Sequence, residues 1–303
     1  MRIEVHGDID AFSAAAWPLL TSDEANHTVM LAALQGARQA HAAGAPDRGT
    51  TPWRSAAVVS GSTTVAAALR SRGNWLLGNG PDAACAALGA ALSELAADTV
   101  PERGIVGPRA QVEAFASRCA RRTRVELVMP LLKLMRAPDD GPAPAAGHLL
   151  PLDPATGELH WQRLIDWTMA FHAEARLTDP REQVEHNLRA RLPRASLAFW
   201  IDAAGEPACL IGATLIAPSG ARIGPVYTPP EHRGQGFARA AVVAGCRRLI
   251  EQGARAVFLF TDAANPISNS LYRRIGFAPI GEHLHLMFVA DGAAATAELP
   301  PRA

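Results

Sequence analysis

The chain has 303 residues, 49% of them hydrophobic, and a formal net charge of +0 at pH 7. This length predicts two domains, or two halves of one bilobal unit, and the apolar content excludes a disordered chain. The charge balance gives no electrostatic reason to expect DNA, RNA or an anionic membrane as partner, so a small or neutral partner is expected.

The cysteines and the amino terminus indicate a cytoplasmic protein. The four cysteines are widely separated and lack the short spacing of a zinc site or a redox pair. The opening M-R-I-E-V-H-G-D-I-D carries acidic residues where a signal peptide needs an apolar core. No run approaches the roughly 20 apolar residues of a membrane span.

The first half of the chain, residues 1–136, alternates between strand and helix patterns. Strands are predicted at 2–5, 55–60, 63–70, 74–78, 104–106 and 124–134, and helices at 8–20, 23–40, 82–97 and 109–121. A linker is predicted at 137–147, because A-P-D-D-G-P-A-P-A-A-G contains three prolines and two glycines. A domain boundary there divides the protein almost in half.

The second half, residues 148–290, repeats this alternation. Strands are predicted at 148–152, 196–202, 208–217, 221–227, 256–261 and 283–289, and helices at 158–176, 180–192, 235–251 and 265–275. The turns A-A-G-E-P and P-S-G join three of these strands into an antiparallel meander. The tail 291–303 is expected to be flexible.

The order of elements predicts an α+β fold with a mixed sheet flanked by helices. Strand, helix, strand, helix after a meander requires at least one right-handed parallel crossover. The two halves show a comparable order although their residues are not visibly alike. One topology is therefore expected to occur twice in tandem.

The loop Y-T-P-P-E-H-R-G-Q-G-F-A-R-A at 227–240 joins a strand directly to a helix. Unpaired amides and the positive end of the helix dipole converge there, an arrangement that suits a phosphate group. Gly234 and Gly236 allow close approach of the backbone, and Arg233 and Arg239 add positive charge. Neither G-x-G-x-x-G nor G-K-[ST] is present, so the familiar nucleotide fingerprints are not met.

This loop resembles the acetyl-CoA-binding signature of the GNAT N-acetyltransferase superfamily. Arg233, Gly236 and Ala238 match R/Q-x-x-G-x-G/A, and N-P-I-S-N-S-L-Y-R-R-I-G-F at 265–277 is similar to a second GNAT signature. The resemblance covers roughly 148–290 and implies a GNAT fold and acetyl-CoA as co-substrate. It implies that the pyrophosphate binds the loop and the pantetheine arm binds the preceding strand, through Arg233, Gly234, Gln235, Gly236, Phe237 and Ala238 and through Val226, Tyr227 and Thr228, respectively.

The second signature supplies the candidate acid. In GNAT enzymes a tyrosine at the place of Tyr272 commonly protonates the departing CoA thiolate. A phenol can do this because its ordinary pKa, about 10, lies above that of a thiol, about 8.5. Asn265 and Asn269 are expected to contact or position the cofactor. Helical spacing places both asparagines with Tyr272 on a polar face, and Ile267, Leu271 and Ile275 on a core face.

The general base stays open at this point. Many GNAT enzymes carry a glutamate on the strand that corresponds to A-R-I-G-P-V-Y, which contains no carboxylate. Attack by a protonated amine requires a base, direct or through water. Asp262, at the end of a strand and near Asn265, is the preferred candidate, and the others are Glu231, Glu174 and His172.

The remaining polar groups are assigned structural roles. His283 and His285 alternate on one strand and are expected on an exposed face without a third metal ligand, so no metal is predicted. The first-half loop N-W-L-L-G-N-G-P-D at 74–82 has Gly78 and Gly80 but lacks the Arg-x-x-Gly-x-Ala spacing. Residues 1–136 are therefore interpreted as a degenerate, CoA-free GNAT-like half.

Two functions of different classes are compatible with these motifs. The first is acetyl transfer to a small-molecule or peptide amine by direct attack in a ternary complex. The second is a non-catalytic acyl-CoA-binding or protein-interaction module, with which the missing strand carboxylate is compatible. A Rossmann-like nucleotide binder is disfavoured because a meander precedes the loop. The acceptor, the acyl chain length and the oligomeric state are not determined by the sequence.

Overall fold

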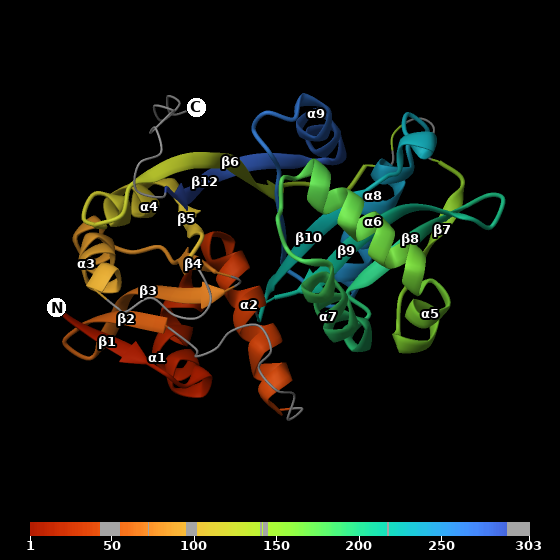
Figure 1. Cartoon of the computed structure of the whole chain (residues 1–303). Helices are drawn as coiled ribbons and strands as arrows, with labels where there is room; N and C mark the ends of the chain where they lie inside the picture. Colours follow the sequence, from red (N-terminus) through yellow and green to blue (C-terminus); the bar gives the residue numbers. More distant parts are fainter. Residues whose placement is uncertain are drawn as a thin grey trace. The chain divides into compact units, whose positions relative to one another are not determined.

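A computed structural model describes residues 1–42, 55–71, 73–94, 102–139, 141, 145–216 and 218–289. The chain divides into two compact units (Figure 1). Unit 1 comprises Met1–Leu131, Thr261–Ala264 and the residues from Pro279 onward, and unit 2 comprises Leu132–Phe260 and Asn265–Ala278.

Unit 1 contains a mixed sheet with helices on it. Its strands follow the order β1 (Arg2–His6), β2 (Ser55–Ser60), β3 (Thr63–Ser71), β4 (Asn74–Leu77), β5 (Gly104–Pro108), β12 (Phe277–Phe288) and β6 (Thr123–Leu134), of which residues 123–131 belong to unit 1. Its helices are α1 (Ile9–Ser22), α2 (Glu24–Ala42), α3 (Asp82–Glu94) and α4 (Arg109–Ala116). Among the five described pairs from β1 to β12, only β4–β5 is parallel, and α3 is the crossover helix between these two strands.

Unit 2 repeats this plan. Its strands follow the order β11 (Ala256–Phe260), β10 (Gly220–Tyr227), β9 (Pro207–Leu215), β8 (Leu197–Asp202) and β7 (Gly147–Pro151). The last residues of β6 (Thr123–Leu134), which is the neighbour of β11 in the strand order, also belong to unit 2. Its helices are α5 (Pro154–Leu159), α6 (Trp161–Glu174), α7 (Arg181–Arg191), α8 (Phe237–Glu251) and α9 (Pro266–Ile275), with short 3₁₀ turns η1 (Leu192–Arg194) and η2 (Pro230–His232). The parallel β10–β11 pair is joined through α8.

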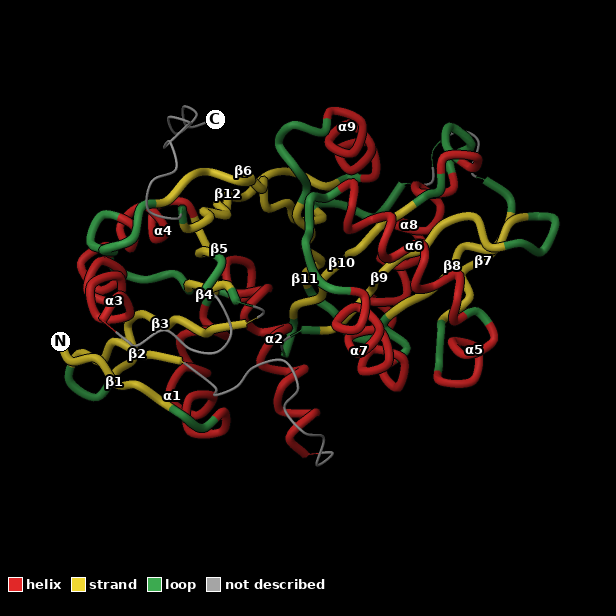
Figure 2. Tube along the Cα trace, in the orientation of Figure 1, coloured by secondary structure: helices red, strands yellow, loops and turns green. Residues whose placement is uncertain are grey.

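Two apolar clusters lie on opposite faces of the unit 2 sheet. One joins α8 and α9 to the sheet, and the other joins α6 and α7 to it (Figure 2). Gly245 of α8 faces Ile211 so closely that a Cβ there would lie 2.9 Å from the isoleucine Cδ1. A glycine at this position therefore allows α8 to lie close to β9.

Local sequence explains where several elements begin. The Asp8 side chain accepts hydrogen bonds from the amides of Asp10 and Ala11 and caps α1. Asp153 and Thr156 form a capping box at the start of α5, with Pro154 in the first helical turn. Asp, Thr and Pro at these places satisfy or remove amides that the first turn leaves unpaired.

The observed elements differ from the predicted ones at identifiable places. The predicted helix 158–176 is two helices that meet at His160, and the helix predicted at 109–121 ends at Ala116. The predicted tail 291–303 lies outside the described residues.

The compact units also depart from the predicted domain boundaries, because residues 132–136 lie in unit 2 and residues after Pro279 lie in unit 1. The reason is strand pairing. Residues 283–287 of β12 pair antiparallel with residues 104–108 of β5, so a strand from the second half completes the sheet of the first.

Candidate functional site

Strands β10 and β11 separate at the end nearest the glycine loop. Their parallel ladder pairs only Gly220–Arg222 with Ala256–Phe258. Beyond it β10 remains paired with β9 through Val226 and Tyr227, after a bulge at which Gly224 has a φ of +141°. The edge of β10 that faces β11 is therefore open along the residues predicted to bind the pantetheine arm, Val226, Tyr227 and Thr228.

The glycine loop forms a nest of backbone amides. Gly234 and Gly236 have φ values of +78° and +84°, a conformation that L-residues rarely adopt. Gly236 is the N-cap of α8, and no side chain forms a capping hydrogen bond there. In the first hydrogen bond of the helix, the Ala240 amide donates to the Gly236 carbonyl. The amides of the first turn, from Phe237 to Arg239, consequently lack partners within the helix.

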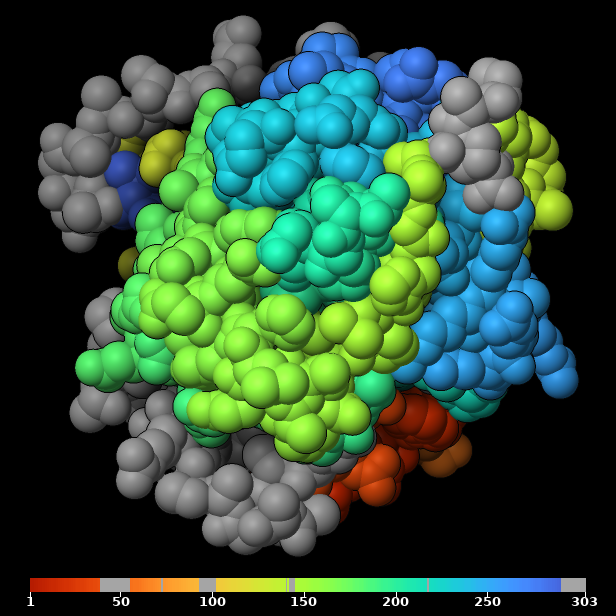
Figure 3. All heavy atoms as spheres, turned by 90° about the vertical axis from the view of Figure 1, so that its right-hand side faces the viewer, coloured from red at the N-terminus to blue at the C-terminus, as the bar shows by residue number. Residues whose placement is uncertain are grey.

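The surface of this nest is exposed. Residues 233–236 are all exposed, whereas Phe237 is buried. The cyan spheres near the top of Figure 3 include this part of the chain on the surface of unit 2. The amides and the positive end of the α8 dipole therefore fit an anionic group such as a diphosphate.

The two arginines of the loop are each paired with a carboxylate of unit 2. The NH2 nitrogen of Arg233 lies 2.5 Å from Glu174 Oε1, and its Nε donates to the Thr228 carbonyl at 2.9 Å. Arg239 Nε donates to the Asp139 carbonyl at 3.2 Å, and its NH2 lies 3.5 Å from the Asp139 carboxylate. The backbone amides, rather than these guanidiniums, are thus the donors directly available to an anion.

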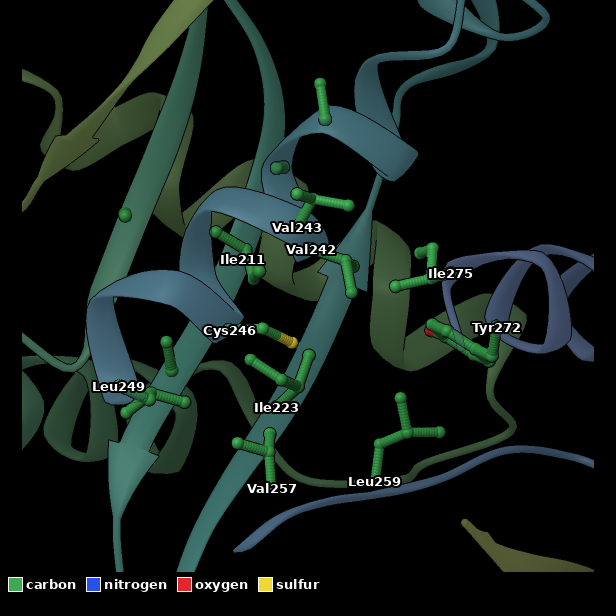
Figure 4. Packing of buried hydrophobic residues seen from close by; sticks show 14 of the residues in the cluster. Ile211, Ile223, Val242, Val243, Cys246, Leu249, Val257, Leu259, Tyr272 and Ile275 are labelled. Atoms are coloured by element: carbon green, nitrogen blue, oxygen red, sulfur yellow. The ribbon is translucent and has the colours of Figure 1, made fainter. Parts of the chain in front are cut away.

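Tyr272 lies in the apolar cluster that contains the start of α8. The tyrosine is 8% exposed, and the same cluster includes Phe237 and, partly buried, Val226 and Ala238. Figure 4 shows Tyr272 and Ile275 pointing from α9 into this cluster. Tyr272 is thereby brought together with predicted residues of the loop and of the splayed strand.

Burial raises the pKa of the Tyr272 phenol, and the neighbouring thiols of Cys209 and Cys246 add to the rise. The phenol therefore keeps its proton at neutral pH, as a proton donor must. Its ring contacts that of Phe277, with centroids 6.1 Å apart.

The predicted faces of α9 are right for Leu271 and Ile275 and wrong for Tyr272 and Ile267. Tyr272 is buried, whereas Ile267, assigned to the core face, is 80% exposed. Tyr272 and Ile275 are three residues apart and share the buried face, so the core begins only in the second half of this short helix. Asn265 is exposed and caps α9 by accepting a hydrogen bond from the Ser268 amide at 3.0 Å, and Asn269 is half-buried.

Asp262 belongs to unit 1 and not to unit 2. It lies in the segment Thr261–Ala264, where the Thr261 and Ala263 amides donate to carbonyls of β6. Its carboxylate accepts a hydrogen bond from the Ala264 amide at 2.8 Å. This contact gives Asp262 a role in the turn before α9.

The other candidate bases occupy different surroundings. Glu231 is exposed on η2, and Glu174 ends α6 and pairs with Arg233. His172 is buried on α6, with Nδ1 3.8 Å from the Asp179 carboxylate. Asp139, which pairs with Arg239, was not predicted, because no local pattern links residues 100 positions apart.

The corresponding loop of unit 1 is filled by internal hydrogen bonds. The Asn79 amide donates to Nε2 of the buried His27 at 2.8 Å, and the Gly80 amide donates to the Asn79 side chain at 3.1 Å. A Cβ on Gly80 would lie 2.5 Å from the Val65 carbonyl oxygen. Amides that an anion would need are therefore already bonded to this unit's own side chains.

The histidines of β12 are not on an exposed face, contrary to the prediction. His283 is 1% exposed and lies 3.3 Å from the Asn26 side chain, and His285 lies 3.2 Å from that of Asn74. The residues that cover this face of β12 include Asn26 of α2 and Asn74 of β4. In the described part of the chain, no group of three His, Cys, Asp or Glu residues could hold a metal ion, and no helix is long and apolar enough to cross a membrane.

Comparisons with known proteins find similarity to acetyltransferases. Residues 161–277 match the model of the acetyltransferase (GNAT) family. A mycothiol acetyltransferase of Arthrobacter sp. is 48% identical over 58 residues, which is 18% of each chain. A mycothiol acetyltransferase of Cellulomonas flavigena is 31% identical over 144 residues, or 41% of this chain and 38% of the relative. The chain thus spans between about a fifth and two fifths of the length of these relatives.

Solved structures match nearly the whole chain in fold. A tandem GNAT protein from the clavulanic acid biosynthesis pathway has a TM-score of 0.60 at 16% identity, covering 97% of this chain and 100% of that one. A GCN5-related N-acetyltransferase from Sphaerobacter thermophilus has a TM-score of 0.59 at 15% identity, covering 94% and 95%. The predicted fold class, a mixed sheet with flanking helices used twice in tandem, is confirmed.

Proposed function

We propose that the chain transfers an acetyl group from acetyl-CoA to an amine, because residues 161–277 match the model of the acetyltransferase (GNAT) family. The observation that carries the proposal is the open edge of β10 directly before the exposed glycine nest. A small-molecule acceptor is proposed because the Arthrobacter and Cellulomonas relatives are named mycothiol acetyltransferases, and a peptide amine is the alternative acceptor.

Different residues of unit 2 are proposed to bind different parts of acetyl-CoA. Acetyl-CoA supplies the activated thioester. The amides from Arg233 to Ala238 hold its diphosphate, and the open edge at Val226, Tyr227 and Thr228 holds the pantetheine arm and the thioester carbonyl. Asn265 and Asn269 position the cofactor from α9.

Tyr272 is the proposed acid. In direct transfer the amine nitrogen bonds to the acetyl carbon, the carbon–sulfur bond breaks, and the tyrosine proton passes to the sulfur. Because burial raises its pKa, the phenol is protonated at neutral pH and is available to donate this proton as the thiolate departs. The amine proton leaves to a carboxylate or to water.

The test is thiol release from acetyl-CoA in the presence of a panel of small amines, aminothiols and peptides. We expect release with at least one acceptor, and a fall of about 100-fold or more in Tyr272→Phe with acetyl-CoA affinity retained. Leu271→Ala is the control for packing around α9, because Leu271 is a partly buried neighbour on the same helix.

Two other outcomes contradict the proposal. Binding of acetyl-CoA without release against any acceptor supports the non-catalytic acyl-CoA-binding module. Equal release by wild type and Tyr272→Phe removes the tyrosine from the mechanism.

A further inference from the structure

Three arginines of unit 2 lie around the turn that leads from α7 into β8. Arg191 is in the last turn of α7, Arg194 is in the 3₁₀ turn η1, and Arg248 is in the last turn of α8. Arg191 donates through Nη2 to the Ser196 carbonyl at 3.0 Å, and Arg248 donates through Nη1 to the Ala195 carbonyl at 2.9 Å. Two successive carbonyls of one turn thus bind guanidiniums from two different helices.

Arg194 lies in this turn without a counter-ion. Its Nε is buried and forms no hydrogen bond with any described residue. Burial lowers the pKa of Arg194 and of Arg248, and no acid of the described chain opposes this shift for either of them. A cation that is withdrawn from water without a partner costs free energy, so an anion at this turn would be stabilising.

The helix ends explain only part of this arrangement. Arg191 and Arg248 lie at the carbonyl ends of their helices, where the helix dipole stabilises a cation. Arg194 lies beyond the end of α7, whereas Arg189 of the same helix pairs with Glu158 at 3.3 Å. A buried donor without a partner often binds a water molecule or an ion, and of these only an anion also offsets the charge.

This turn is remote from the glycine nest. Gly236 precedes the first turn of α8 and Arg248 lies in its last turn, so roughly 18 Å of helix separates them. Arg191 Nη2 also lies 3.4 Å from the Gly224 carbonyl, at the bulge of β10. One phosphate group therefore cannot occupy both places, and the turn is a site of its own.

We propose that Arg191, Arg194 and Arg248 bind a small doubly charged oxyanion at this turn, of which the phosphate group is the type. A guanidinium matches a phosphate in shape and donates two parallel hydrogen bonds to it. Three cations attract a dianion more strongly than they attract a monocarboxylate. The inference goes beyond the proposed function and does not depend on it.

The test compares thermal unfolding of the wild type and Arg194→Met in about 20 mM phosphate and in chloride of equal ionic strength, at about pH 8. We expect phosphate to raise the Tm of the wild type by about 2 °C or more through binding, and Arg194→Met to lose this increase. In chloride, Arg194→Met is expected to be at least as stable as the wild type, because methionine removes a desolvated cation.

Arg189→Met is the matched control. It removes an arginine from the last turn of α7 that has its own acid, Glu158, and we expect it to retain the full increase. Phosphate also stabilises folded proteins in general, and all three proteins keep the glycine nest, so only the difference between them counts. An equal increase in all three proteins, or an equal loss in both variants, overturns the inference.

Two further anions define the ligand. Acetate, a monoanion, is expected to raise the Tm of the wild type less than phosphate does, and an equal increase contradicts a site for a dianion. Glycerol phosphate distinguishes the two sources of a phosphate group. A larger increase than with inorganic phosphate indicates a phosphorylated small molecule, and a smaller increase indicates the free ion.

Phosphorus NMR provides a direct measurement and serves as well if Arg194→Met does not fold. The variant is then Arg194→Lys, which keeps the positive charge but cannot form the paired hydrogen bonds of a guanidinium. We expect the wild type and Arg189→Met to broaden the phosphate resonance equally and Arg194→Lys to broaden it less. No broadening by the wild type, or equal broadening by all three proteins, contradicts the proposed site.

Discussion

The reactivity of individual cysteine thiols follows from their burial. Burial raises the pKa of Cys85, Cys209 and Cys246 to about 12. At about pH 8 only a minute fraction of each is the reactive thiolate, and the surrounding side chains also block access. Cys119 is half-buried instead.

Iodoacetamide treatment of the native protein at about pH 8 is therefore expected to modify Cys119 and spare the other three cysteines. Peptide mass spectrometry measures the modification, and treatment in urea, which exposes all four thiols, is the control. Rapid native modification of Cys209 or Cys246 would show that the packing between α8 and the sheet is not as described.

His27 is the residue that fills the unit 1 loop. Its Nε2 accepts from the Asn79 amide and its Nδ1 lies 3.0 Å from the Leu20 carbonyl. His27→Ala leaves a buried amide without its acceptor, so we expect the free energy of unfolding to fall by about 1–3 kcal/mol or more. Urea denaturation measures this, with the exposed His186→Ala as a control that changes stability by less than about 0.5 kcal/mol.

The same histidine gives the fold an acid sensitivity. Burial lowers the pKa of His27 below its ordinary value, so the unfolded chain binds a proton more readily than the folded one. Its contribution to stability is complete above about pH 6.5 and is lost as pH falls through the lowered folded value. A wild type no less stable at about pH 5 than at pH 7, relative to His27→Ala, would contradict this assignment.

At the scale of the element, the loop between β10 and α8 depends on backbone conformation. Gly236 has a φ of +84°, yet a Cβ there would meet only Ala145, at 3.8 Å. Gly253, after the carboxyl end of α8, has a φ of +98° and no atom within 4 Å of such a Cβ. Alanine is strained by about 1–2 kcal/mol at both positions, because the positive φ is unfavourable for an L-residue and not because the added Cβ meets a neighbour.

Gly236→Ala and Gly253→Ala are therefore expected to lose similar stability, while only Gly236→Ala weakens coenzyme A binding, by about ten-fold or more. Thermal unfolding and titration calorimetry give the two quantities. If Gly236→Ala binds coenzyme A as tightly as the wild type does, or if both variants lose the same affinity, the loop conformation is not what binds the cofactor.

Local patterns predict some elements of this chain and not others. The glycine loop and the meander could be predicted because each depends on residues within a few positions. The buried face of α9 could not be predicted from local sequence, because the side chains that bury Tyr272 come from α8 and the sheet. The Arg233–Glu174 and Arg239–Asp139 pairs join residues 59 and 100 positions apart, so no spacing rule predicts them.

At the scale of the whole molecule, one topology carries two different loops. In unit 2 the loop residues 233–236 are exposed, whereas in unit 1 the amides of the corresponding loop donate hydrogen bonds to His27 and Asn79. The sequence predicted the repeat and the degenerate first loop from the missing arginine spacing. It did not predict that β12 pairs with β5, because strand pairing over such a separation has no local signal.

The central claim is that backbone amides between β10 and α8 hold a diphosphate, once per chain. Titration calorimetry with coenzyme A and with pantetheine, which lacks the diphosphate, tests it most directly. We predict one coenzyme A site per chain and binding of pantetheine at least about 100-fold weaker. No heat from coenzyme A, two equivalent sites, or equal affinity for both compounds would contradict the claim.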